Sequence, residues 1–197
     1  MKRMPGLLLL AIFCAAPSAH AHLMNTGFGP FYDGLTHLFV TPEDLLPVIA
    51  LALLAGLRGP QFGRAVLFVL PAAWLVGTAA GIFWHIPLTP PALTAVVTIA
   101  FGALVAADRP LRLWLVVGGA VLLGLLHGSL NGFELGRQSA IGLTVVGTGV
   151  ALFVLVALLA GQVTAVRAAW ARIAVRVAGS WIAASGLLLL GWVVRRG

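Results

Sequence analysis

Cysteine and charge are both scarce in this sequence. The only cysteine is Cys14, and charged residues make up 9% of the chain, against about a quarter in ordinary soluble domains. Because residues 22–197 contain no thiol, neither a disulfide nor a thiolate metal site is available there. With 61% hydrophobic residues, the composition excludes a water-soluble fold.

Acidic residues are also few. Five of them oppose 12 basic residues, which gives a net charge of +7. Nearly all the basic residues stand in short gaps between apolar runs, where they orient membrane spans. The sequence has no basic patch interleaved with aromatic residues of the kind that holds nucleic acid. We therefore expect the lipid bilayer as a partner and no nucleic acid.

Long apolar runs fill nearly the whole chain after the first thirty residues. Each has about 20 residues, the length that crosses a hydrocarbon core. The sequence therefore predicts an all-α fold, a polytopic membrane helical bundle of six transmembrane helices in one domain, 22–197. The predicted spans are 35–57, 63–83, 91–106, 111–130, 139–162 and 174–194. Breaker clusters such as Arg58-Gly59-Pro60 and Asn131-Gly132 separate them.

Residues 1–21 have the order of a secretory signal peptide. Lys2 and Arg3 precede an apolar stretch, and Ala19-His20-Ala21 fits the cleavage pattern of a signal peptidase. Cleavage there would leave His22 as the first residue. The alternative is that the segment stays attached as a seventh helix, although about ten apolar residues are short for a span.

Arginine positions agree with the orientation that a signal peptide demands. With the mature N-terminus in the periplasm, the first, third and fifth connections are cytoplasmic, and they hold seven of the ten arginines after residue 21. These are Arg58, Arg64, Arg109, Arg112, Arg167, Arg172 and Arg176. Residues 166–177 resemble a basic amphipathic segment lying on the anionic leaflet. We expect a multi-pass protein of the bacterial inner membrane with both termini periplasmic.

The ionisable residues other than arginine gather on the outer side of this topology. After the signal peptide they are His22, Asp33, His37, Glu43, Asp44, His85, Asp108, His127 and Glu134. All except Asp108 fall in the outer half of the membrane or beyond it. Asp108 stands beside Arg109, with which we expect an ion pair.

The first span carries two pairs of ionisable residues. Asp33 and His37 are four residues apart and share a helix face. Glu43 and Asp44 follow about two turns deeper, directly after Pro42. A charge in the bilayer costs at least a few kcal/mol, so these carboxylates should face a cavity, a partner or an ion. Pro42 and Pro47 also predict broken helix geometry, which is typical of ion sites in transporters.

Three further histidines are candidate ligands. His127 lies near the outer end of the fourth span, His85 just beyond the second, and His22 at the new N-terminus. Other roles stay open: an interhelical hydrogen bond for His127, an interfacial position for His85, and an accident of cleavage for His22. Imidazole and carboxylate without thiolate suit borderline divalent ions such as nickel, cobalt or zinc.

Two motifs resemble those of the HupE/UreJ family. That family has a signal peptide ending near a histidine, a first-span motif close to His-Pro-x-x-Gly-x-Asp-His-Leu, and a later histidine followed by glycine. The corresponding stretches here are Gly-Pro-Phe-Tyr-Asp-Gly-Leu-Thr-His-Leu at 29–38 and Leu-His-Gly at 126–128. Gly34, His37 and Leu38 match the first motif.

The match to the first motif is partial. Pro30 fits if one residue is inserted, Gly29 replaces the first histidine, and Thr36 replaces the aspartate. Asp33, one helical turn before His37, is the candidate for the missing carboxylate.

The resemblance implies a nickel or cobalt permease of the kind associated with hydrogenase and urease. We therefore expect secondary transport of a divalent transition-metal cation, because the sequence has no nucleotide-binding loop. The alternative is a non-transporting membrane accessory factor for metalloenzyme assembly, and in either case metalloenzyme maturation proteins are expected partners. We expect no enzymatic activity and no permanently bound cofactor, with Ni²⁺ or Co²⁺ as the transported ligand. The expected metal ligands are Asp33, His37, Glu43, Asp44, His127, His22 and His85.

Overall fold

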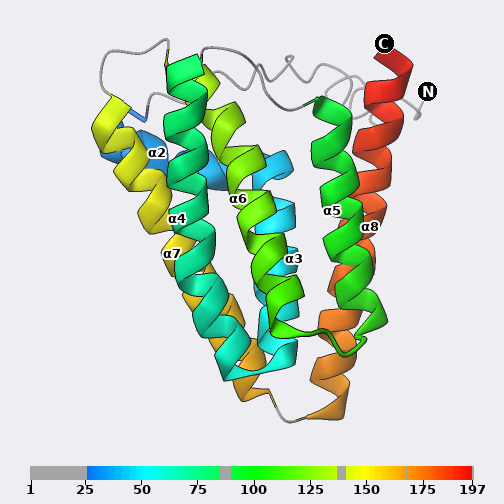
Figure 1. Ribbon diagram of the computed structural model, residues 1–197. Helices are drawn as coiled ribbons and strands as arrows, with labels where there is room; N and C mark the ends of the chain where they lie inside the picture. Colours follow the sequence, from blue (N-terminus) through cyan, green and yellow to red (C-terminus); the bar gives the residue numbers. More distant parts are fainter. Residues whose placement is uncertain (1–25, 85–89, 137–140, 167, 197) are drawn as a thin grey trace, which may run out of the picture.

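The computed structural model describes residues 26–84, 90–136, 141–166 and 168–196, and every regular element in these ranges is an α-helix (Figure 1). The predicted signal peptide, 1–21, lies outside them. The helices are α2 (Pro30–Val40), α3 (Pro42–Arg58), α4 (Pro60–Trp84), α5 (Pro91–Ala107), α6 (Leu113–Leu135), α7 (Ile141–Ala165) and α8 (Ala169–Arg196). The all-α prediction is confirmed for these residues.

Proline begins four of the seven helices. Pro30, Pro42, Pro60 and Pro91 are the first residues of α2, α3, α4 and α5. The backbone N–H groups of the first turn have no acceptor within the helix, so proline, which lacks an N–H, loses no hydrogen bond there. Its fixed φ also suits a helix. Residues that look like breakers in the sequence therefore act as helix starts, and α4 begins three residues earlier than predicted.

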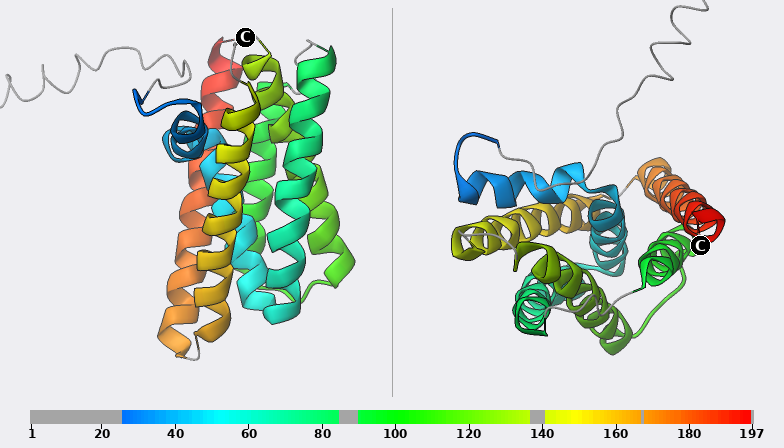
Figure 2. Two further views of the ribbon diagram at one scale, coloured as in Figure 1. Left: turned by 90° about the vertical axis from the view of Figure 1, so that its left-hand side faces the viewer. Right: turned by 90° about the horizontal axis from the view of Figure 1, so that it is seen from above.

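The first predicted span is a broken pair of helices. α2 and α3 meet at an angle of 75°, with Thr41 between them in an extended conformation. A residue before proline is driven out of the helical region by the proline ring, so Pro42 forces the break. The predicted break is confirmed at Pro42, whereas the break expected at Pro47 is wrong, because Pro47 lies inside α3 without interrupting it. As a result α2 lies across the bundle while α3 runs along it (Figure 2).

α3 is the central helix of the bundle. It contacts α4, α5, α6, α7 and α8, and eight of the nine residues from Val48 to Gly56 are buried. Around it, α4 packs on α6, α2 packs against α7, and α5 pairs with α8 (Figures 1 and 2). The polar start of α3 is thereby placed among helices that are distant in sequence.

Small residues set the distance between α4 and α6. A Cβ added to Gly128 would overlap the carbonyl oxygen of Trp74, and one added to Gly132 would overlap that of Thr78. Such close backbone contact is the usual role of glycine between membrane helices. The prediction that Asn131-Gly132 ends the helix is wrong, because α6 continues to Leu135 and uses Gly132 for packing.

Four helices, α4, α6, α7 and α8, are long and apolar enough to cross a membrane. The bent pair of α2 and α3 passes the same test as one broken span, and α5 contributes a shorter apolar helix. These helices are those of a multi-pass membrane protein. Among the described residues the test is passed by four helices, or by five spans if the bent pair counts as one, and six spans stay a prediction.

α8 begins earlier than predicted. It runs from Ala169 to Arg196 without interruption, so Arg172 and Arg176 lie in its first turns. The stretch 166–177, predicted to be a basic amphipathic segment on the anionic leaflet, therefore forms the first turns of α8 from residue 169 on. Arg172 and Arg176 of these turns both bond to groups at the end of α5.

The α4–α6 contact gives a first prediction. Gly128→Ala should lower the free energy of unfolding by about 1–3 kcal/mol, the usual cost of overpacking, because the new methyl group overlaps the α4 backbone. Thermal unfolding in detergent measures the change. Gly118→Ala is the matched control on the same helix, since nothing lies within 4 Å of its added Cβ. Equal effects of the two substitutions would contradict this packing.

Candidate polar site at the broken helix

The break between α2 and α3 brings two side chains together. His37 lies in the last turn of α2 and Asp44 in the first turn of α3. The backbone N–H of Thr41 caps α2 by donating to the carbonyl of His37 at 3.1 Å. Because the chain turns by 75° at this point, Nε2 of His37 comes within 3.7 Å of Oδ2 of Asp44.

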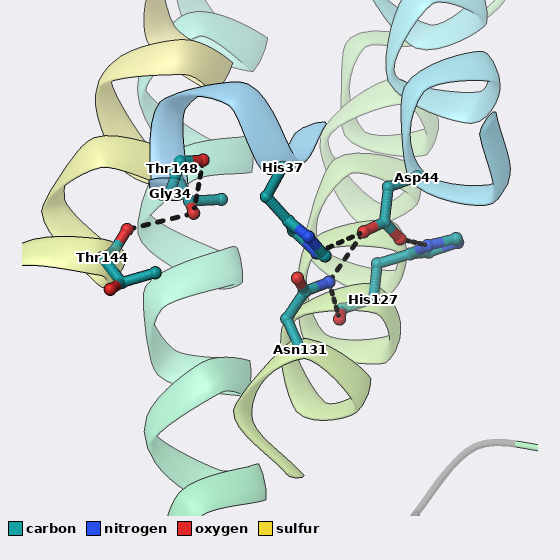
Figure 3. A network of polar contacts seen from close by, with 7 residues as sticks. All are labelled: Gly34, His37, Asp44, His127, Asn131, Thr144 and Thr148. Atoms are coloured by element: carbon teal, nitrogen blue, oxygen red, sulfur yellow. Dashed lines mark hydrogen bonds and ion pairs between the residues drawn. The ribbon is translucent and has the colours of Figure 1, made fainter. Parts of the chain in front are cut away.

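Asp44 is the centre of a buried polar network (Figure 3). Its Oδ1 lies 2.7 Å from Nδ1 of His127, and its Oδ2 accepts a hydrogen bond of 2.8 Å from the side-chain amide of Asn131. The carboxylate therefore joins α2, α3 and α6. His37, Asp44, His127 and Asn131 are all buried, so their mutual contacts replace those with solvent.

Asn131 ties the network to α6. It lies one helical turn after His127, and the same amide group donates to the carbonyl of His127 at 3.0 Å. Residues four apart share a helix face, so both side chains of this pair point at Asp44. His127 contacts Oδ1 of Asp44, and Asn131 donates to Oδ2.

The ring of His127 is fully buried and stacks on Trp74 of α4. The ring centroids are 5.7 Å apart with an interplanar angle of 26°, and the side chain is 0% exposed. Nε2 of His127 and Nε1 of Trp74 are both buried without a hydrogen-bond partner among the described residues. An unpaired buried polar atom is costly, so the imidazole nitrogen that faces away from Asp44 is the exceptional group of this site.

Two helix ends of opposite dipole meet at the break. Asp44 sits at the N-terminus of α3, the positive end of a helix dipole, and His37 sits at the C-terminus of α2, the negative end. Broken spans in transporters present helix ends to ions in this way. The break therefore places the positive end of one helix dipole beside Asp44 and the negative end of another beside His37.

Two other predicted ligands, Asp33 and Glu43, lie outside this network. Asp33 accepts hydrogen bonds of 2.6 Å from both the backbone N–H and the hydroxyl of Thr26, and Glu43 is exposed. His22 and His85 are outside the described residues. Of the seven expected ligands, the structure brings together His37, Asp44 and His127. The carboxylate beside His37 is that of Asp44, in place of the expected Asp33.

The network has the chemistry of an oriented histidine ligand. A carboxylate accepts the proton of Nδ1, and Nε2 of the neutral ring then carries a free lone pair. Metal-binding histidines are commonly held in this way by a carboxylate on the other nitrogen. Within the described ranges, however, no three His, Cys, Asp or Glu side chains form a group that could hold a metal ion.

Asp108 forms a second charged cluster at the other end of the bundle. It bonds to Arg58 of α3 and to Arg172 of α8, whose Nε lies 2.6 Å from Oδ2. The expected pairing with Arg109 is wrong. Asp108 ends α5 in a left-handed conformation, and its side chain pairs with the arginines that α3 and α8 bring to this end.

Two residues of the polar site were missing from the expected ligands. Asn131 has a sequence signal, its spacing of four from His127, but it stands in a pair that looks like a helix breaker. Trp74 lies in the middle of α4, whereas tryptophan in membrane proteins favours the interfaces. That unusual depth is the signal that could have identified it.

Comparison with known proteins identifies one family. A family model described as HupE / UreJ protein matches residues 9–189 of this chain, which includes both sequence motifs and every helix that contributes to the polar site. No curated protein and no solved structure matches the chain.

The central position of Asp44 gives a second prediction. Asp44→Ala should destabilise the fold by about 1–3 kcal/mol for each buried donor that loses its acceptor, namely His127 and Asn131. The free energy of unfolding in detergent measures the loss. Glu43→Ala is the neighbouring control, because its exposed carboxylate contributes less than about 1 kcal/mol through the helix dipole. A loss no larger for Asp44→Ala than for Glu43→Ala would show that the network is unimportant to the fold.

Proposed function

Because the chain belongs to the HupE/UreJ family, we propose that it is a secondary transporter of a divalent transition-metal cation, nickel or cobalt, across the bacterial inner membrane. The observation that carries the proposal is the buried Nε2 of His127. This nitrogen has no partner among the described residues, while Asp44 holds the opposite nitrogen at 2.7 Å. The imidazole is thus poised as a ligand at membrane depth.

In the proposed topology the chain crosses the membrane six times. α2 and α3 form one broken span, and α5, with 17 residues, is at the short end of the range for a span. The signal peptide is removed, and both termini lie in the periplasm. The end of the bundle with Arg58, Arg64, Arg109, Arg112, Arg172 and Arg176 faces the cytoplasm, in agreement with the positive-inside rule.

The site then lies in the outer half of the membrane. His127 is eight residues before the end of α6, which corresponds to a depth of about 12 Å at 1.5 Å per residue. Asp44 supplies the negative charge that offsets the cost of bringing a cation to this depth. His37 contacts the other oxygen of this carboxylate, with Nε2 at 3.7 Å from Oδ2.

The chain's own residues account for selectivity in this proposal. An imidazole nitrogen as ligand favours a borderline divalent ion over a hard ion such as Mg²⁺, which prefers oxygen ligands and keeps its waters. A proton and the cation compete for the same nitrogen lone pair, so release can be coupled to a proton gradient. No enzymatic role is proposed.

The prediction for transport concerns uptake of radioactive nickel and cobalt into proteoliposomes. His127→Ala should abolish saturable uptake, because it removes the only fully buried imidazole of the described chain. Asp44→Asn should weaken uptake about 10- to 100-fold, the usual effect of losing the carboxylate that orients a metal-binding histidine. Glu134→Gln is the control, since this exposed residue lies on α6 outside the network.

Three outcomes separate the hypotheses. Loss of uptake in the first two variants with normal uptake by Glu134→Gln supports transport through this site. Metal binding by equilibrium dialysis without any uptake would favour the accessory factor for metalloenzyme assembly. Wild-type uptake by His127→Ala would overturn the assigned site.

A further inference from the structure

The arginine cluster at the opposite end of the bundle carries an unbalanced positive charge. The Asp108 carboxylate bonds to both Arg58 and Arg172, so two guanidinium groups share one negative charge. The Arg58 side chain is 9% exposed, and its Nε is buried without a partner among the described residues. Taking a net charge out of water is costly unless a counter-charge is present. The cluster therefore favours an added anion.

A pocket adjoins the two arginines. It has a volume of about 260 Å³ and is lined by Arg58 and Arg172 together with the ends of α3 and α7. A water molecule occupies about 30 Å³ in the liquid, so the pocket has room for a polar group several times larger. Arg172 is 54% exposed, which leaves part of its guanidinium free to bind such a group.

An apolar groove continues from this pocket along the side of the bundle. It has a volume of about 240 Å³ and runs between α4 and α7, where small residues such as Gly63, Ala157 and Gly161 line it. Pro60 and Thr164 line both the pocket and the groove, so the two are contiguous. Arg64 also lines the groove and adds a further positive charge.

A basic pocket that continues into an apolar groove on a membrane helix bundle matches one class of ligand. We propose that this end of the bundle holds an anionic phospholipid, with its phosphate at Arg58 and Arg172 and one acyl chain in the groove between α4 and α7. Basic pockets between membrane helices at the cytoplasmic side are typical sites for anionic head groups. The site is separate from the polar network at Asp44 and does not depend on metal transport.

The test measures lipid bound to the purified full-length protein by native mass spectrometry. Phosphatidylglycerol, which is anionic, is compared with phosphatidylcholine of the same acyl chains, and inorganic phosphate is added as a separate competitor. Arg172→Gln removes a guanidinium from the pocket. Gly161→Leu adds bulk to the groove from a position where nothing lies within 4 Å of an added Cβ.

Each substitution has a matched control outside the site. Arg112→Gln removes an exposed arginine at the same end of the bundle, and Gly118→Leu adds the same side chain to another open glycine. The wild type should prefer phosphatidylglycerol, Arg172→Gln should reduce its binding about fivefold, and Gly161→Leu should also reduce it. Arg112→Gln and Gly118→Leu should bind as the wild type does.

Two results would overturn the proposal. Equal binding of the two lipids would exclude a site for anionic head groups. Unchanged lipid binding by Gly161→Leu, with displacement by inorganic phosphate, would show a free-anion site in which the groove has no part. If Arg172→Gln fails to fold, Gly161→Leu and the lipid comparison in the wild type decide the question alone.

Discussion

The contact between Asp44 and His127 is the constraint on which the site depends. It joins α3 to α6 at 2.7 Å in a place where both side chains are buried. A carboxylate at this depth needs a partner, and a histidine that gives one nitrogen to the carboxylate has the other nitrogen left for a ligand. One interaction thus serves the stability of the fold and the chemistry of the site.

The rest of the bundle makes this contact possible. The break at Pro42 turns the start of α3 into the bundle, and close packing at Gly128 and Gly132 holds α6 against α4. Trp74 of α4 then covers the ring of His127. At the other end, Asp108 holds α3 and α8 through arginines. The two ends differ in character, with a buried acid and imidazoles at one and a surplus of guanidinium groups at the other.

Features that depend on local chemistry were predictable from the sequence. Apolar runs gave the order of the helices, and Pro42 gave the break in the first span, because proline acts on its own neighbours. The family resemblance, carried by His37 and by His127-Gly128, is confirmed by the family match.

Features that depend on packing between distant segments were not predictable. Spacing along one helix favoured Asp33 as the carboxylate for His37, but the angle at Thr41 brings Asp44 there instead, while Asp33 bonds to Thr26. Asn131-Gly132 looked like a helix end because its use against α4 is visible only in three dimensions. The most direct test of the account is ¹⁵N NMR of histidine-labelled protein in nanodiscs, with the His127→Gln spectrum as the assignment. We expect an unprotonated Nε2 on His127 whose signal shifts when Zn²⁺ is added as a diamagnetic probe; a protonated Nε2 that ignores the metal would contradict the account.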